Sequence, residues 1–378
     1  MQTRTRNALV FAAGLSVLVG AVVWISQKRD PVRASVSALD AVPEGALLVG
    51  RAELEPLRRS GIAGPLLSEA REIPGLGKVA DVCGFDPLDG LTEIVIAIPA
   101  AGDDGAFGLV AAGLINRDAL VACATKVIEG RGGRPVVNTI GSFRTVRDAS
   151  LAKSDAEIAV REGGPVLLGA GRYLRSMIDT SEGQIPSIRG DKGFTRLNND
   201  VGRGAITVTV VFSEEQRRLL AEELSRSPSQ SSPAASVVGL GLAVAVEEHV
   251  LLHGIVACDR APACAELSNI FDKRRKAEAD GLVVRLLGIG PALERLRIDA
   301  EGERVHGRVD LSKNEATNLL ERLLVLRAAA AQKGETEDKQ FDDERSRRKR
   351  PPEAEVDVAP APATSGSASQ AKPKASAP

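Results

Sequence analysis

An unbroken apolar run near the N-terminus constrains this chain more than any other feature of its sequence. Ala8 to Ile25 contains Ser16 as its single polar side chain. A helix of this length rises roughly 27 Å, at about 1.5 Å per residue, which is close to the roughly 30 Å hydrocarbon core of a bilayer. The run therefore predicts a transmembrane helix, and the lipid bilayer is the first expected partner of the chain.

The end of this run does not resemble a cleavage site for a secretory signal. Ile25 is followed directly by polar and charged residues, whereas signal cleavage needs small residues close behind the apolar stretch. Residues 36–38 could serve as such a site, but charges separate them from the run. We therefore favour an uncleaved signal anchor over residues 1–30 and a short tether over residues 31–37, with a cleaved signal as the alternative.

Cysteine usage decides the expected orientation, because basic residues flank both ends of the run and the positive-inside rule gives nearly a tie. The chain has four cysteines, Cys83, Cys123, Cys258 and Cys264. The last two enclose a short loop with a proline, which suits a disulfide in an oxidising compartment. The sequence therefore predicts a single-pass protein whose bulk lies outside the cytoplasm. Four buried thiols in a cytosolic domain are the alternative.

Composition changes abruptly near the C-terminus. Residues 332–378 are charged and then rich in Pro, Ala and Ser, with few large apolar side chains. Such a segment cannot bury enough apolar surface to offset its chain entropy, so we expect a disordered tail. Its basic cluster, Arg345 to Arg350, is most simply a solvated stretch, and a weak tether to anionic polymer or lipid is the functional alternative.

The globular part between tether and tail looks like two diverged copies, residues 38–185 and 186–331. Gly45 to Val49 aligns without gaps on Gly204 to Val208, and each is a short apolar strand followed by a charged helix. A hairpin and a cysteine-bearing helix follow in both copies. The expected hairpins are Leu91 to Ile98 with Phe107 to Ile115, and Val237 to Val246 with Val250 to Cys258.

The remainder of each copy is expected to add strands and a closing amphipathic helix. The strands are predicted over 135–147, 157–169, 281–287 and 296–309, and the helices over Tyr173 to Ile178 and Asn314 to Leu326. The order strand, helix, strand, strand, helix, strand predicts an α+β fold of two split β-α-β units. We expect antiparallel sheets with helices on one face, and the two sheets either lie side by side or join.

Two short motifs carry a resemblance. Ala41 to Leu54 resembles the start of the globular part in signal-anchored envelope proteins of Gram-negative bacteria, and Cys83 to Leu88 is similar to predicted proteins of myxobacterial type. These proteins have no assigned activity, so the resemblance implies no catalytic residue. It implies a location in the bacterial inner membrane with the bulk of the chain in the periplasm, and it supports pairing Cys83 with Cys123.

Motifs for catalysis and metal binding are weak. His249 and His253 have the spacing of a zinc-binding pair on a helix, but they lie in β-type sequence. Ser150 and Lys153 match a Ser-x-x-Lys motif without its partner motifs. Asp86 and Asp89 are the remaining candidates for acid–base work, and their Asp-Pro and Asp-Gly dipeptides favour a turn instead. These patterns therefore assign no catalytic, cofactor or metal-binding residue.

Nucleic-acid and nucleotide binding are also disfavoured. Basic and acidic residues nearly balance, at 49 and 50, and aromatic residues make up only 3% of the chain. The chain thus lacks both a basic field and stacking platforms. Gly75 to Lys78 lacks the remaining residues of a P-loop, and Gly239 to Gly241 lacks the third glycine of a dinucleotide-binding fold and leads into a strand.

These patterns favour a membrane-anchored, extracytoplasmic binding or scaffolding protein that is not an enzyme and needs no cofactor. Its partner would be another envelope protein or a second copy of the chain. The alternative is a small molecule or peptide bound in a cleft between the two copies, because ligand sites favour such interfaces. An enzyme with an unfamiliar site is a third hypothesis, which would require a cluster of buried ionisable side chains.

Overall fold

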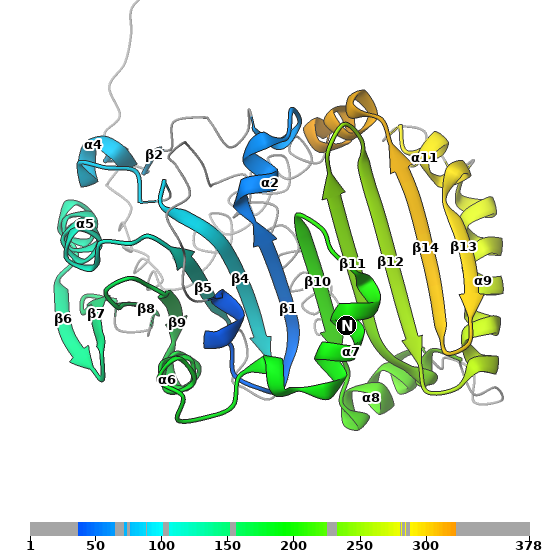
Figure 1. The fold of residues 1–378 in the computed structure, drawn as a ribbon, viewed down its shortest axis with the longest axis horizontal. Helices are drawn as coiled ribbons and strands as arrows, with labels where there is room; N and C mark the ends of the chain where they lie inside the picture. The colour runs from blue at the N-terminus through cyan, green and yellow to red at the C-terminus, as the bar shows by residue number, and fades with distance from the viewer. Residues whose placement is uncertain are drawn as a thin grey trace, which may run out of the picture. The chain divides into compact units, whose positions relative to one another are not determined.

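Figure 1 shows the fold in a computed structural model, which describes residues 37–64, 72–73, 76–87, 89–100, 106–151, 156–224, 233–279, 281, 284 and 288–322. The predicted transmembrane run, almost all of the tether and the predicted disordered tail lie outside these residues, so those three predictions stay predictions. Within the described ranges, no helix has both the length and the apolar character needed to cross a membrane.

The described part of the chain is built on one large antiparallel sheet of twelve strands. Their order is β13-β14-β12-β11-β10-β1-β4-β5-β9-β8-β7-β6. The strands of the first half are β1 (Ala46–Glu53), β4 (Leu91–Pro99), β5 (Gly108–Gly113), β6 (Pro135–Ile140), β7 (Phe143–Asp148), β8 (Ala156–Val160) and β9 (Val166–Ala170). Those of the second half are β10 (Ile206–Val211), β11 (Val237–Val246), β12 (Val250–Cys258), β13 (Arg297–Glu301) and β14 (Arg304–Leu311). A separate small hairpin pairs β2 (Glu72–Ile73) with β3 (Gly77–Lys78).

The two halves of the sheet meet where β1 pairs with β10, and these two strands lie side by side in Figure 1. Leu48 lies opposite Val210, and Gly50 lies opposite Val208. Because β1 comes from the first predicted copy and β10 from the second, one sheet runs through both halves. The sheets therefore join.

Helices pack on both faces of this sheet. Successive side chains of a strand point to opposite faces, and Val95 packs in a cluster with α6 and α7, whereas Ile94 packs in a cluster with α2 and α5. The α7 face carries η1 (Ala38–Ala41), α6 (Gly171–Ser181), η2 (Ile188–Gly190) and α7 (Lys192–Val201). The opposite α9 face carries α2 (Leu54–Arg59), α5 (Arg117–Gly130), α9 (Ala261–Ala279) and α11 (Gly290–Arg295). The expectation of helices on a single face was therefore wrong.

Most of the expected elements are present. Both predicted hairpins are confirmed as β4–β5 and β11–β12, and both cysteine-bearing helices are confirmed as α5 and α9. The charged helices expected after the first strand of each copy are confirmed as α2 and α8 (Glu214–Leu224), and the structure also contains the short helices α4 (Val79–Cys83) and η3 (Pro233–Ser236). The predicted helix over Tyr173 to Ile178 is α6, and residues 313–322 are helical where a helix was expected from Asn314.

The later strands differ from the prediction. The segments 135–147, 157–169 and 296–309 are each a hairpin of two strands rather than one strand, because glycines at Gly141, Gly163 and Gly302 take positive φ and turn the chain. Val284, in the predicted strand over 281–287, is helical, and most of that segment lies outside the described residues. The helix α7 was not predicted.

On the α9 face, one row of residues that crosses all twelve strands of the sheet is apolar. One cross-strand row consists of Ile298, Gly307, Gly254, Leu242, Val208, Gly50, Ile96, Leu109, Leu168, Ile158, Val146 and Val137. Every strand contributes one residue to this row. Such a face requires cover from helices or from another molecule.

Candidate ligand-binding site

A pocket lies at one end of this apolar row, where α9 and α11 cover β11, β12, β13 and β14. We call it the α9 pocket, and its volume is about 490 Å³, within the usual range of about 300–1,000 Å³ for small-molecule sites. It is lined by Leu240, Gly241, Gly254, Ile255, Val256, Phe271, Arg274, Arg275, Glu278, Leu293, Leu296, Ile298, Val305 and Gly307. Its surface is overwhelmingly apolar, and an apolar cavity holds water poorly.

Two glycines form part of the floor of the α9 pocket. Gly254 of β12 lies directly opposite Gly307 of β14. Among the described residues, a Cβ atom added at Gly254 would meet only two backbone oxygens at 3.9 Å, and one added at Gly307 would meet only the Leu296 Cδ1 atom at 3.8 Å. Neither glycine has a positive φ. Neither packing nor backbone conformation therefore requires glycine at these two positions.

Other glycines of the same sheet region have a clear packing reason. Gly239 and Gly241 of β11 face α7, and a Cβ added there would approach the Leu197 Cδ2 atom to 2.6 Å and the Val201 Cγ2 atom to 2.0 Å, respectively. Glycine lets α7 pack closely on β11 at these positions. The pair Gly254 and Gly307 has no such neighbour, and its missing side chains leave the pocket open.

Arg275 fixes the wall of the α9 pocket that α11 provides. Its guanidinium donates to the carbonyl oxygens of Leu293 and Glu294, at 3.1 and 3.2 Å, near the C-terminus of α11. It also donates to the Asp272 Oδ1 atom at 2.7 Å. Lys276 and Arg275 together hold the pKa of Asp272 below its usual range by hydrogen bonding. A helix C-terminus favours a cation in this place.

The disulfide Cys258–Cys264 holds the start of α9 against the sheet. Cys258 is the last residue of β12, Cys264 lies in the first turn of α9, and their sulfurs are 2.08 Å apart. The expected pairing is thus present, and it connects the floor of the pocket to one of its walls. Cys83 of α4 is joined to Cys123 of α5, at a distance from the α9 pocket in Figure 1.

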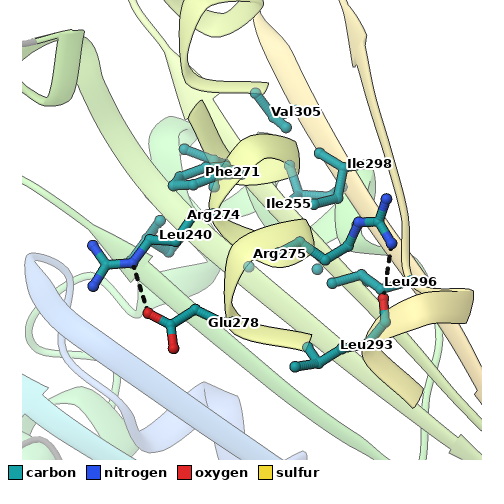
Figure 2. A pocket seen from close by; sticks show the side chains of 14 residues that line it. Leu240, Ile255, Phe271, Arg274, Arg275, Glu278, Leu293, Leu296, Ile298 and Val305 are labelled. Carbon is teal, nitrogen blue, oxygen red and sulfur yellow. Dashed lines mark hydrogen bonds and ion pairs between the residues drawn. The ribbon is translucent and has the colours of Figure 1, made fainter. Parts of the chain in front are cut away.

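The rim of the α9 pocket carries charge. Lys273, Arg274, Arg275 and Lys276 are consecutive on α9. Figure 2 shows Phe271, Arg274 and Glu278 along one side of the pocket. Arg274 is 78% exposed and forms an ion pair of 3.8 Å with Glu278, which is 57% exposed. The rim thus contains a guanidinium that is loosely held, beside an interior without charge.

The histidines are arranged differently from a helical zinc pair. His249 lies in the turn between β11 and β12, and its Nδ1 atom is 3.3 Å from the Oδ1 atom of Asp310. His253 lies in β12 as expected, with its Nε2 atom 3.2 Å from Nδ1 of His306 on β14. Within the described part of the chain, no three potential ligands among His, Cys, Asp and Glu come together to hold a metal.

The remaining candidates occupy turns and loops. The Asp89 amide donates to the Asp86 carbonyl oxygen, as expected for a turn, and both residues line a second cavity beside α2 and α5. The Ser150 hydroxyl donates to Asp148, and Lys153 lies outside the described residues. The basic cluster from Arg345 also lies outside them.

The three cavities described for this part of the chain each lie within one predicted copy. The α9 pocket and a smaller cavity beside α7 are lined by residues of the second copy, and the cavity beside α2 is lined by residues of the first. None of the three lies between the copies. A ligand site in a cleft between them stays a prediction without a matching cavity.

Comparisons with known proteins add little to this geometry. No protein-family model matches the sequence, and no curated protein matches it. Among solved structures, one match is crystal form I of TP0453, with a TM-score of 0.43 and 12% sequence identity. The match covers 77% of this chain and 99% of that one. A likeness at this level carries no inference about function.

Sequence reasoning missed the α9 pocket. The pair Gly254 and Gly307 joins residues that are far apart in the chain, so nothing local marks them as neighbours. One signal was available: the run Lys273 to Lys276 is the longest unbroken cationic stretch among the described residues. This run points to a binding site only once the structure places it beside an apolar cavity.

Proposed function

We propose that this protein is a membrane-anchored, extracytoplasmic binding protein whose α9 pocket holds the apolar part of a ligand. The apolar run Ala8 to Ile25 supports the anchor. The two disulfides support an oxidising compartment. The α9 pocket supports binding of a molecule rather than a purely scaffolding role.

The proposal of a ligand rests on the space that Gly254 and Gly307 leave open in the floor of the α9 pocket. Glycine inside a strand costs about 0.5–1 kcal/mol relative to alanine, and here no contact with the described part of the chain requires it. A chain selected for stability alone would fill this space with side chains. An empty apolar floor is therefore best explained by an occupant that supplies the missing contacts, each buried methylene contributing about 0.8 kcal/mol.

The two halves of the sheet support the proposal of diverged copies. The strands β1, β4 and β5 are neighbours in one half and are followed in sequence by α5. The strands β10, β11 and β12 are neighbours in the other half and are followed by α9. The first half has a cavity of its own beside α2 and α5, but its lining includes the charged side chains of Glu55, Arg58 and Asp86, so we assign the apolar ligand to the second copy.

The proposal is tested with N-phenyl-1-naphthylamine, a neutral probe that fluoresces in apolar surroundings. We expect saturable binding to the wild-type protein. The double variant Gly254→Leu/Gly307→Leu should bind at least about ten-fold more weakly, because two leucine side chains would occupy the floor. Gly190→Leu is the matched control, since a Cβ there meets nothing within 4 Å and φ is not positive.

Two results would contradict the proposal. One is the absence of saturable probe binding by the wild-type protein. The other is equal affinity of the wild type and the double variant, because binding would then occur elsewhere. A thermal unfolding scan shows whether the double variant is folded, and the single variants Gly254→Leu and Gly307→Leu provide smaller changes to the same floor.

A further inference from the structure

The rim of the α9 pocket suggests the chemical class of the ligand. We infer that the pocket binds an anionic amphiphile, whose alkyl chain lies on the glycine floor and whose charged end meets Arg274. This inference rests on the proposed function and adds the head group to it. The shared chemistry is a long alkyl chain that ends in a carboxylate or a phosphate.

The interior of the pocket suits an alkyl chain. The floor includes Gly254 and Gly307, and the apolar row continues from them through Leu242 to Val208 on neighbouring strands. Leu242 and Val208 are only half-buried. An extended chain can therefore run across the strands, from the pocket toward the middle of the sheet, with carbon contacts at each step.

The cations of the rim are not equally available. Arg275 is only 16% exposed and is engaged with Asp272 and with the end of α11. Lys276 forms an ion pair of 2.6 Å with Asp272. Arg274 lines the pocket, and Glu278 is its ion-pair partner across one exposed helical turn. Arg274 is therefore the cation that can turn toward a ligand.

An anionic head group agrees with the local charge. Residues 272–278 of α9 contain four consecutive cations, at 273–276, and two carboxylates, Asp272 and Glu278. Asp272 is already shared by Arg275 and Lys276. Glu278 competes with the ligand for Arg274. A guanidinium binds a carboxylate or phosphate with two parallel hydrogen bonds, so an anion can replace Glu278 without losing the contact.

Displacement of N-phenyl-1-naphthylamine by four alkyl probes tests the inference. Dodecanoate and dodecyl phosphate are the anionic probes, dodecanol is neutral, and dodecyltrimethylammonium is cationic. At low salt we expect both anions to bind up to about five-fold more tightly than dodecanol, the upper limit for one exposed ion pair. The cation should bind most weakly, and high salt should abolish the differences.

Variants assign the preference to Arg274. Arg274→Gln should remove the preference for both anions over dodecanol. Glu278→Gln should increase the preference, because it frees Arg274 and removes a repelling charge. Arg59→Gln is the matched control, since Arg59 is 76% exposed and forms an i,i+4 ion pair with Glu55 on α2.

The outcomes separate this inference from the proposed function. Equal affinity of the wild type for dodecanoate and dodecanol would overturn the anionic head group and leave the apolar pocket standing. A preference that survives Arg274→Gln would overturn the role of Arg274. A wild-type protein that does not bind the naphthylamine probe at all would overturn both the inference and the function on which it rests.

Discussion

The carboxylate of Glu93 is a buried charge with a full set of partners. It is 7% exposed on β4 and accepts hydrogen bonds from the Ser37 hydroxyl at 3.0 Å and the Ala38 amide at 2.8 Å. The Arg51 guanidinium also contacts it and reaches Glu53 at 2.8 Å. Glu93 thus attaches η1, the first described turn of the chain, to the middle of the sheet.

Replacing this charge should be costly. We expect Glu93→Gln to lower the free energy of unfolding by about 1.5–3 kcal/mol, because hydrogen bonds to a charged group are lost and Arg51 loses one of its two described ionic partners. Urea unfolding followed by circular dichroism measures the change. Glu44→Gln, at an exposed position, is the control, and equal stability of the two variants would contradict the structural role of Glu93.

His306 makes stability depend on pH near neutrality. The Nδ1 atom of His253 donates to the Val201 carbonyl oxygen, 3.0 Å away, so the Nε2 atom of neutral His253 accepts from Nδ1 of His306. Burial lowers the pKa of His306, and its electrostatic interactions with His253 and Arg308 lower it further, with Glu301 opposing them.

The sign of the pH effect follows from this lowered pKa. As pH falls below about 6.5, the unfolded chain takes up the proton first, so the free energy of unfolding falls until the folded pKa is passed. Carboxylates such as Glu315, whose pKa Arg295 and Ser312 lower to about 2, act only in a more acidic range. We expect His306→Gln to reduce the pH dependence of the urea unfolding midpoint between about pH 7 and about pH 5. The same slope in wild type and variant would exclude His306 as its source.

At the scale of elements, replacing glycine by alanine on the two faces of β11, β12 and β14 should have opposite effects on stability. Gly241→Ala places a Cβ 2.0 Å from the Val201 Cγ2 atom, and overpacking of this kind costs about 1–3 kcal/mol. Gly254→Ala meets no close neighbour among the described residues and should stabilise the protein by up to about 1 kcal/mol, because alanine reduces the conformational entropy of the unfolded chain. Thermal midpoints of the two variants decide the point, and a destabilised Gly254→Ala would mean that the floor is closed rather than open.

Individual elements were more predictable than their pairing. The strands β11 and β12 were predicted with their observed bounds, because a continuous β-branched run and a turn are local signals. The helix α7 was missed, since its N-cap Asp191 lies in a cluster of Gly, Pro and charge that looks like a linker. Its burial depends on Phe194 and Leu197 meeting distant strands, which no local pattern encodes.

At the scale of the whole molecule, the proposed copies share a sheet but not the alignment expected from sequence. The gapless alignment equates Leu48 with Thr207. Leu48 lies opposite Val210 on the α9 face, and Thr207, three residues from Val210, points to the other face. A two-fold axis between β1 and β10 would map each face of the sheet onto itself. Because Leu48 and Thr207 lie on opposite faces, the structurally equivalent residues differ from the gapless alignment by a shift of one residue. The irregularity in β1 between Ala46 and Leu48 provides a place for it.

The compartment of the chain stays a prediction that one fusion experiment tests. Alkaline phosphatase joined after residue 330 should be active on the outer side of the membrane, because the sequence predicts an anchor at Ala8 to Ile25 and disulfides outside the cytoplasm. Deleting the apolar run should abolish this activity at equal protein level.

The same compartment should be visible in the cysteines of the native protein. Mass mapping without reduction should recover a peptide pair joining Cys258 to Cys264 and another joining Cys83 to Cys123, the pairs that lie at bonding distance. Four thiols that react with an alkylating reagent in unreduced protein, together with an inactive fusion, would place the bulk of the chain in a reducing compartment. The anchor could then still be correct with the opposite orientation, since basic residues flank both of its ends. An active fusion with free thiols would instead separate the topology from the disulfides, and the α9 helix would then be attached to β12 by packing alone.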